Sequence, residues 1–385
     1  MADSRISRID DAAAPPVGHV LHVADREVCL RFGPMLTQVW QGLCATGWRV
    51  ALLTDDREML ARLAGTPVEG HGVPHLGGWW AGDLDAYLQA HFRPRPDLAH
   101  LWGTAGLWRL QRWSRRDNVP LLVHALGAAH VARLMRGRLR DDQHLAVAAQ
   151  PLAVPLLTRF PMAASRCQII PPGIAPPLRV LPARPAERTF SVLCVGPLAE
   201  QRGLEVLIDA VAELRRKGGA VHVALIGAGP GVSAVWRRIH ARQVHGCVLL
   251  SDEPRLWEQV LPEVDACVVP GTQPELTIVP LLAMALGKLV IASRDQPAEW
   301  FVEDRTAWQF TPGSAVELAY LLARAIEQPQ RAQEVGRLAG EYVRAHHSVR
   351  ELVERLVGLY GRLCTWRSTA ILTALENNRG ERGTE

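Results

Sequence analysis

Lysine is nearly absent from this chain. Among its 385 residues only Lys217 and Lys288 are lysines, so 41 of the 43 basic residues are arginine. We attribute this bias to coding composition rather than to a particular chemistry. Because 39 acidic residues almost balance the basic ones, the net charge is only +4, and we expect no nucleic-acid partner.

Paired cysteines and long apolar runs are also missing. None of the seven cysteines belongs to a C-x-x-C pair, which argues against zinc ribbons and thioredoxin-type sites. Cys194, Cys247 and Cys267 lie inside apolar runs, where a thiol behaves as a small buried hydrophobe and indicates a reducing compartment. The first 16 residues are polar, and no apolar stretch reaches the roughly 18 residues of a membrane span. We therefore expect a cytoplasmic protein, at most peripheral at the inner membrane face.

Short apolar runs alternate with helix-length stretches in two successive halves of the chain. Strands of a parallel sheet covered on both faces have continuous rather than alternating apolar residues. The sequence therefore predicts two Rossmann-like, doubly wound α/β domains facing each other across a cleft. The runs expected as strands are 20–23, 49–54, 98–102, 120–126 and 167–172 in the first half, and 190–196, 221–227, 247–250, 265–270 and 288–293 in the second.

The predicted boundary lies in a segment rich in proline and arginine, residues 171–188. Proline fixes its own φ and disfavours helix at the preceding residue, so we interpret this segment as a linker. We place an N-terminal acceptor-side domain at 1–180 and a C-terminal donor domain at 181–359. A helix at about 360–376 is expected to pack back on the first domain.

Several segments resemble, in order and spacing, the motifs of family-4 glycosyltransferases of the GT-B type, the glycosyl transferases group 1. IIPPGIAPP (169–177) is similar to the family's VIPNGVD, and VGPLAEQRGLEVLI (195–208) is similar to VGRLVPEKGLDLLI. VALIGAGP (223–230) is similar to LLIVGDGP, and TIVPLLAMALGKLVIAS (277–293) is similar to GIVPLEAMAAGKPVVAS. The resemblance implies transfer of a hexose from a nucleotide diphosphate sugar to a glycan, lipid or small-molecule acceptor, with retention and without a metal or other cofactor.

The resemblance also implies a donor site that holds the leaving diphosphate with helix N-terminal amides and fixed cations. Arg202 keeps the positive charge where the family has lysine, although a solvated loop arginine is the structural alternative. Gly203 and Gly227 belong to the same motifs. Thr277 and Ile278 replace a step whose backbone amides face the diphosphate, and backbone donors survive substitution. Helix capping is the alternative role of Thr277.

Three expected donor contacts are missing from the chain. Pro197 stands where the family has arginine, and Pro274 and Leu282 stand where it has the two glutamates of an E-x7-E element. Glu275 is the candidate catalytic substitute, and an ordinary surface glutamate is its structural alternative. Losing a hydrogen bond with a charged group costs roughly 1.5–3 kcal/mol, so we expect weaker donor binding or a different donor.

The acceptor-side domain offers two candidate residues. The family's Thr-x-His-Gly element reads His124-Ala125-Leu126-Gly127 here, so His124 is the candidate catalytic histidine, with a structural strand-end role as the alternative. Gly33 lies in the run Phe32-Gly33-Pro34-Met35, expected as a loop that approaches the donor phosphates. Pro34 is alternatively a helix start.

A basic helix is predicted over residues 130–142. We expect its arginines either to contact an anionic membrane or a phosphorylated acceptor, or to form a solvated face balanced by Asp141 and Asp142. The arginines are Arg133, Arg136, Arg138 and Arg140.

Three rival functions remain open at the level of sequence. Loss of the contacts at Pro197, Pro274 and Leu282 suits a non-catalytic GT-B scaffold or regulatory subunit. A sugar-nucleotide epimerase has the same fold. A nicotinamide enzyme is the weakest rival, because the glycines at 227–231 follow the second strand of their domain, whereas a dinucleotide fingerprint follows the first.

Overall fold

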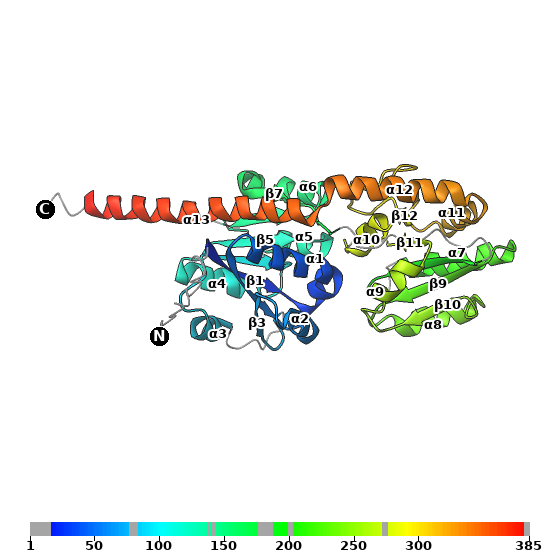
Figure 1. The fold of residues 1–385 in the computed structure, drawn as a ribbon, viewed down its shortest axis with the longest axis horizontal. Coiled ribbons are helices and arrows are strands. Elements are labelled where there is room, and N and C mark those ends of the chain that lie inside the picture. Colours follow the sequence, from blue (N-terminus) through cyan, green and yellow to red (C-terminus); the bar gives the residue numbers. More distant parts are fainter. Residues whose placement is uncertain are drawn as a thin grey trace, which may run out of the picture.

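The structure, a computed structural model, describes residues 17–76, 84–137, 139–140, 143–175, 188–198, 203–271 and 276–380. Within these ranges the chain forms two α/β domains, each built on one parallel β-sheet. Figure 1 shows the domains side by side along the longest axis of the molecule. The expected fold class is confirmed. The predicted boundary near residue 180 lies outside the described residues and stays a prediction.

The N-terminal sheet has seven parallel strands in the order β3-β2-β1-β4-β5-β6-β7. The order reverses between β1 and β4, so the carboxyl ends of these strands flank a topological switch point, where open α/β sheets bind ligands. The strands are β1 Gly18–Ala24, β2 Trp48–Thr54, β3 Glu69–Gly72, β4 Leu98–Trp102, β5 Leu121–Ala125, β6 His144–Val147 and β7 Cys167–Ile169. The helices are α1 Arg26–Ala45, α2 Arg57–Leu63, α3 Leu84–His91, α4 Leu107–Asp117, α5 Ala128–Arg136, α6 Gln150–Arg159 and the 3₁₀ helix η1 Pro161–Arg166.

The C-terminal sheet has six parallel strands in the order β10-β9-β8-β11-β12-β13, with its switch point between β8 and β11. The strands are β8 Phe190–Val195, β9 Val221–Ile226, β10 Val248–Ser251, β11 Ala266–Val269, β12 Leu289–Ser293 and β13 Trp308–Phe310. The helices are α7 Leu204–Arg216, α8 Val232–Ala241, α9 Trp257–Val260, η2 Leu261–Glu263, α10 Val279–Ala285, α11 Ala315–Glu327, α12 Pro329–His346 and α13 Val349–Gly380.

The start of α1 corrects one prediction. Asp25 is the N-cap, and its Oδ1 accepts the backbone N–H of Val28 at 2.9 Å. The helix therefore begins before Phe32-Gly33-Pro34-Met35, and the expected loop at these residues is wrong. Pro34 lies inside the helix, where it removes one backbone donor without ending the helix. Gly33 is buried, and a Cβ atom there would lie 3.1 Å from the Met59 side chain.

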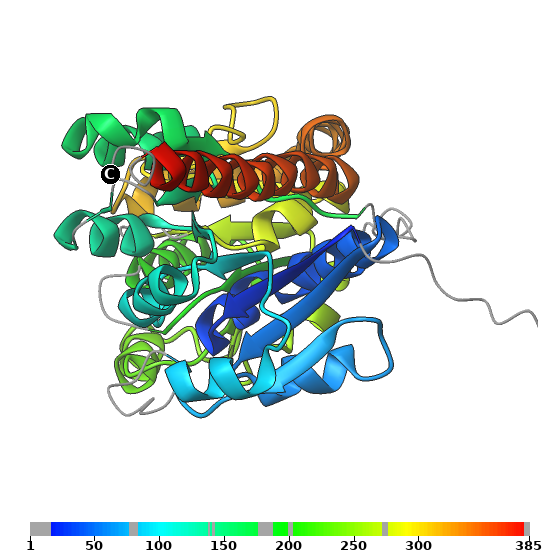
Figure 2. The same cartoon turned by 90° about the vertical axis from the view of Figure 1, so that its left-hand side faces the viewer.

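The last helix returns to the first domain, and both cartoon views show α13 lying across it (Figures 1 and 2). The Tyr360 hydroxyl on α13 is hydrogen-bonded to Nδ1 of His100 on β4 at 2.6 Å, and both side chains are fully buried. Val353 packs so closely on α1 that a Cβ atom at Gly42 would lie 2.8 Å from it. The helix therefore completes the core of the N-terminal domain.

Three buried histidines lie on neighbouring strands close to α13. We call His22, His100 and His124 the histidine layer. His22 is in register with His100, and Trp102, which donates to Nδ1 of His22 at 2.8 Å, is in register with His124. Burial lowers the pKa of His22 and of His124 to about 3, and it lowers the pKa of His100 well below its usual range. The layer is therefore neutral at physiological pH.

Candidate functional site

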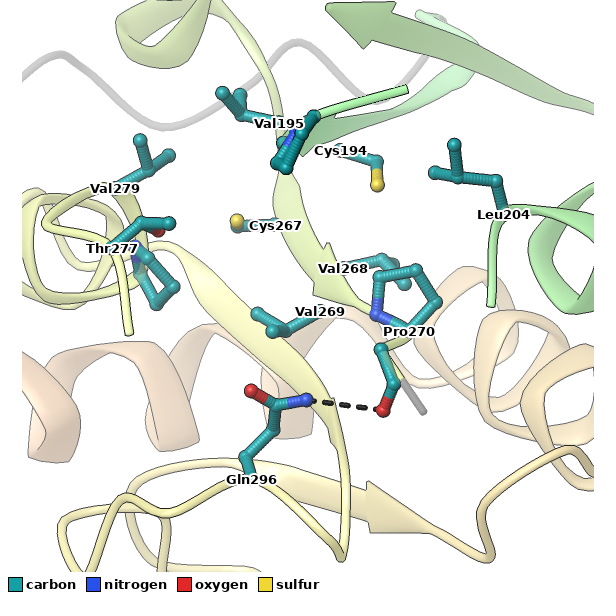
Figure 3. A pocket seen from close by; sticks show the side chains of 14 residues that line it. Cys194, Val195, Leu204, Cys267, Val268, Val269, Pro270, Thr277, Val279 and Gln296 are labelled. Carbon is teal, nitrogen blue, oxygen red and sulfur yellow. Dashed lines mark hydrogen bonds between the residues drawn. The ribbon is translucent and has the colours of Figure 1, made fainter. Parts of the chain in front are cut away.

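An open pocket lies at the carboxyl ends of β8 and β11, the switch point of the C-terminal sheet (Figure 3). Its walls come from the strand ends, the first turn of α7, the start of α10 and the loop after β12. The lining residues are Cys194, Val195, Gly196, Pro197, Leu204, Cys267, Val268, Val269, Pro270, Gly271, Thr277, Val279, Pro280 and Gln296.

The pocket walls are mostly apolar, with few polar side chains among them. Gln296 donates through Nε2 to the carbonyl of Gly271 at 3.2 Å, a bond that is drawn in Figure 3. Thr277 adds a hydroxyl at the start of α10. Burial raises the pKa of the Cys194 thiol to about 12 and also raises that of the Cys267 thiol. Both thiols therefore stay protonated and line the pocket without acting as nucleophiles.

Two glycines predicted at the donor site are required by close backbone packing. Gly203 has φ +73°, and a Cβ atom there would lie 2.2 Å from the carbonyl oxygen of Pro270 in the pocket wall. A Cβ atom at Gly227 would lie 1.8 Å from the carbonyl oxygen of Gly196. Both glycines therefore shape the pocket, whether or not they contact a ligand.

The α10 start joins the two domains. The backbone N–H of Ile278 donates to the carbonyl of Arg31 on α1 at 3.2 Å. This amide, predicted to face a diphosphate, is thus engaged across the domain boundary, whereas Thr277 next to it lines the pocket. Among the missing family contacts, Pro197 is a pocket wall and Leu282 is a half-buried residue of α10. Arg202, Pro274 and Glu275 lie outside the described residues, so their predicted roles stay predictions.

His124 lies in the core rather than at the sheet edge. Its side chain is 1% exposed, and Nε2 is hydrogen-bonded to the carbonyl of Ile170 at 3.2 Å. Its ring stacks on Trp102 with centroids 4.6 Å apart. The enclosed ring offers neither nitrogen to a ligand in this structure.

A second histidine, for which no role is expected from the sequence, lies at the carboxyl edge of the N-terminal sheet. His130 on α5 is 8% exposed, and its Nδ1 accepts the backbone N–H of Leu126 at 3.2 Å. Nearby, Arg133 contacts the Thr104 hydroxyl through Nη1 at 3.4 Å. The signal in the sequence is a histidine three residues after Gly127, at the start of a helix.

Acidic groups occupy the carboxyl ends of β1 and β2. Burial raises the pKa of the Asp25 carboxyl to about 6. Asp55 accepts the backbone N–H groups of Arg26 at 2.7 Å and Leu76 at 3.1 Å. These carboxylates fix the loops that flank the first switch point.

The predicted basic helix is shorter than expected. Helix α5 ends at Arg136, and Gly137 is its C-cap, so Arg140 lies beyond the helix. Arg133 and Arg136 are exposed, whereas Arg138, Asp141 and Asp142 lie outside the described residues. Within the part of the chain that the structure covers, no helix combines the length and apolar character of a membrane-crossing segment.

The family model of glycosyl transferases group 1 matches residues 189–328, which contain the pocket. One curated relative, the alpha-D-kanosaminyltransferase of Streptomyces kanamyceticus, is 26% identical over 174 residues, 44% of this chain and 45% of the relative. The matched part therefore spans less than half of that relative.

Solved structures extend the likeness to both domains. HepE of Anabaena, in complex with UDP-glucose, has a TM-score of 0.74 at 16% identity, covering 90% of this chain and 100% of HepE. Sucrose-phosphate synthase of Thermosynechococcus elongatus has a TM-score of 0.69 at 19% identity, covering 90% of this chain and 99% of its own. The chain is thus a protein of the GT-B fold whose residues 189–328 match the glycosyl transferases group 1.

Proposed function

We propose that this protein is a glycosyltransferase that moves a hexose from a nucleotide diphosphate sugar to an acceptor, with retention at the anomeric carbon and without a metal. The observation that carries the proposal is the position of the pocket, which lies at the switch point of a parallel sheet and inside the segment that matches glycosyl transferases group 1. The acceptor class, whether glycan, lipid or small molecule, belongs to the same proposal.

The relatives support the donor class. HepE of Anabaena was crystallised with UDP, with UDP and glucose, and with UDP-glucose. The curated relative from Streptomyces kanamyceticus is named as a transferase of the sugar kanosamine. We infer a pyrophosphate donor for this chain from these ligands and from the shared fold.

The pocket suits the uncharged part of such a donor better than its phosphates. The apolar walls can cover a base or sugar face, and Thr277 and Gln296 supply the polar side chains. Metal-free cleavage of the donor needs fixed positive charge beside the leaving diphosphate. We assign that charge to Arg202, and we assign the contact with the sugar hydroxyls to Glu275.

Isothermal titration with UDP and GDP tests the donor site. We expect one of the two to bind at one site per chain, with an affinity unchanged by EDTA. Hydrolysis of UDP-glucose and GDP-mannose then tests turnover, and proton NMR of the first-formed sugar reports retention. Absence of both binding and hydrolysis contradicts the proposal, and loss of activity in EDTA contradicts its metal-free form.

A non-catalytic GT-B subunit is the second candidate. It is favoured by Pro197, which presents neither charge nor backbone donor in the pocket wall, and by Leu282 on α10. The Arg202→Ala variant separates the two functions. Donor hydrolysis that disappears in this variant while the melting temperature stays constant excludes the non-catalytic subunit.

A further inference from the structure

His130 lies at the switch point of the N-terminal sheet, whereas the pocket lies at the switch point of the C-terminal sheet. Gly103 directly follows β4, and a Cβ atom there would lie 3.2 Å from His130 Nε2 and 3.0 Å from Val28 at the start of α1. The imidazole therefore lies beside the residue that follows β4, and Glu27 and Arg31 of α1, the helix after β1, act on it electrostatically. These two strands flank the crevice in which such sheets bind ligands.

The hydrogen bond to Leu126 sets the tautomer of this ring. A backbone N–H only donates, so Nδ1 of His130 accepts and carries no proton. Burial, with Arg31 and Arg133 nearby, lowers the pKa of His130 to about 4, and Glu27 acts in the opposite sense. The ring is therefore neutral at physiological pH, with its single proton on Nε2.

The Nε2–H group is an available donor. Unlike the enclosed ring nitrogens of the histidine layer, Nε2 of His130 is not sealed from solvent, and it has no hydrogen-bond partner in the part of the chain that the structure describes. Gly103 keeps this side of the ring open, because it carries no side chain and has φ +89°. A protein hydrogen-bond donor held rigidly and left open at a switch point is suited to an oxygen of a ligand.

Two arginines lie near the ring, Arg31 and Arg133, and Arg31 is paired with Glu27. Arg133 lies one helical turn after His130 and reaches Thr104 in the loop after β4. Arg31 lies on α1, and its carbonyl accepts the Ile278 N–H beside the pocket-lining Thr277. The open face of His130 thus belongs to the N-terminal wall that is joined directly to the start of α10.

We propose that His130 contributes the N-terminal half of the donor site, with Nε2–H donating to an oxygen of the bound nucleotide sugar. The inference rests on the proposed function. It assigns a ligand-binding role to a histidine that lies six residues beyond the enclosed His124. The bond strengthens as negative charge develops on the leaving diphosphate, so its loss lowers turnover and also weakens the binding of free UDP, which carries that charge.

Two substitutions separate the ligand-binding role from the structural one. His130→Gln places an amide NH₂ near the Nε2 position and lacks the Nδ1 acceptor. His130→Asn places its amide oxygen near Nδ1, so it keeps the bond to Leu126 and loses the outer donor. Both variants are compared with the native chain in UDP-glucose and GDP-mannose hydrolysis, in UDP titration and in thermal unfolding.

We expect the Asn variant to lose about 10- to 100-fold in hydrolysis rate, as for removal of a hydrogen bond to a charged group, with a melting temperature close to the native value. The Gln variant should keep more activity despite a lower melting temperature. Activity that follows the melting temperature in both variants, or an Asn variant with native turnover, overturns the role of His130. A native chain that neither binds nucleotide nor hydrolyses either donor overturns the proposed function itself.

Discussion

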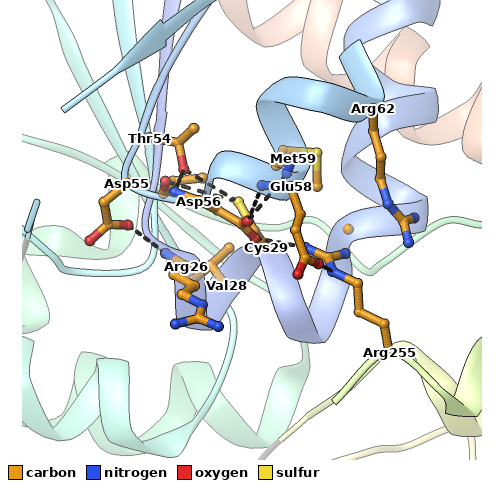
Figure 4. A network of polar contacts seen from close by, with 12 residues as sticks. Arg26, Val28, Cys29, Thr54, Asp55, Asp56, Glu58, Met59, Arg62 and Arg255 are labelled. Atoms are coloured by element: carbon orange, nitrogen blue, oxygen red, sulfur yellow. Dashed lines mark hydrogen bonds and ion pairs between the residues drawn. The ribbon is translucent and has the colours of Figure 1, made fainter. Parts of the chain in front are cut away.

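Arg255 in the C-terminal domain donates through Nη2 to Oδ2 of Asp56 in the N-terminal domain at 2.7 Å. The same carboxylate is the N-cap of α2, where Oδ1 accepts the N–H groups of Glu58 at 3.0 Å and Met59 at 3.2 Å (Figure 4). Arg255 also pairs with the Glu58 carboxylate. One nearly buried carboxylate thus stabilises a helix start and joins the two domains.

Arg255→Ala should open this contact and destabilise the protein by about 1–3 kcal/mol, because the Asp56 carboxylate is only 3% exposed and loses its charged partner. The measurement is urea unfolding, combined with small-angle scattering of the native state. Arg62→Ala is the matched control, since its interdomain pair with Glu258 is about one-third exposed and worth less than about 1 kcal/mol. Equal losses in the two variants would refute the special role of Arg255.

Tyr360→Phe should destabilise the protein by about 1–3 kcal/mol, because it leaves Nδ1 of the buried His100 without its partner. The measurement is again the free energy of unfolding. Tyr342→Phe serves as the control, because Tyr342 is half-buried and its hydroxyl has no hydrogen bond to the described residues. A Tyr360 variant as stable as this control contradicts the expected contribution.

The histidine layer predicts acid sensitivity. The pKa values of His22 and His124 fall to about 3 in the folded chain, and that of His100 also falls far below 6.5. Below pH 6.5 the unfolded chain binds protons that the folded chain excludes, so stability is full above pH 6.5 and is lost as the pH falls toward 3. Each proton contributes about 1.4 kcal/mol per pH unit, and three contribute about 4 kcal/mol per unit.

One carboxyl acts in the opposite sense and reduces the dependence of the free energy of unfolding on pH. Asp25 has a pKa raised to about 6, so the folded chain gains one proton between about pH 6 and 4 that the unfolded chain does not. His130, whose pKa falls to about 4, acts in the same sense as the histidine layer, as do His19, His71 and His347, whose pKa values burial also lowers. Urea unfolding between pH 7.5 and 5 should therefore show net destabilisation that corresponds to about three protons or more. A stability that is flat across this range contradicts the neutral histidine layer.

Gly203→Ala should deform the pocket and weaken nucleotide binding. A Cβ atom there would lie 2.2 Å from the Pro270 carbonyl, in a backbone conformation with φ +73°. Gly218→Ala is the matched control, because φ is +86° but no atom lies within 4 Å of the added carbon. Both variants should lose about 1 kcal/mol of stability to the backbone conformation, and only Gly203→Ala should also lose UDP affinity in titration. If Gly203→Ala binds UDP with the native affinity, this glycine does not shape the nucleotide site.

The sequence predicts the sheets well where strands are continuous and apolar. Each of the ten expected runs overlaps a strand, because runs such as 190–196 and 288–293 are buried on both faces. The missed strands are β3, β6 and β13. They have three or four residues each, too few for a clear pattern. Because β3 reads Glu-Gly-His-Gly, its pairing with β2 rather than local preference forms it.

The candidate site is harder to predict, because burial depends on residues far away in the sequence. His124 lies inside the apolar run 120–126, and nothing local shows that Trp102 and Ile170 enclose it. The contact of Arg255 with Asp56 spans 199 positions. His130 lies inside a helical pattern that also fits a solvated face, and only the fold places its ring beside Gly103.

The contact between Tyr360 and His100 also orders events during synthesis. It spans 260 positions, so the ribosome releases β4 long before α13 exists. Until α13 has been synthesised, the nascent N-terminal domain exposes the face that α13 covers. The N-terminal domain is therefore completed only after all six strands of the second sheet have been made, and a chain truncated before Val349 leaves the ribosome with that apolar face uncovered.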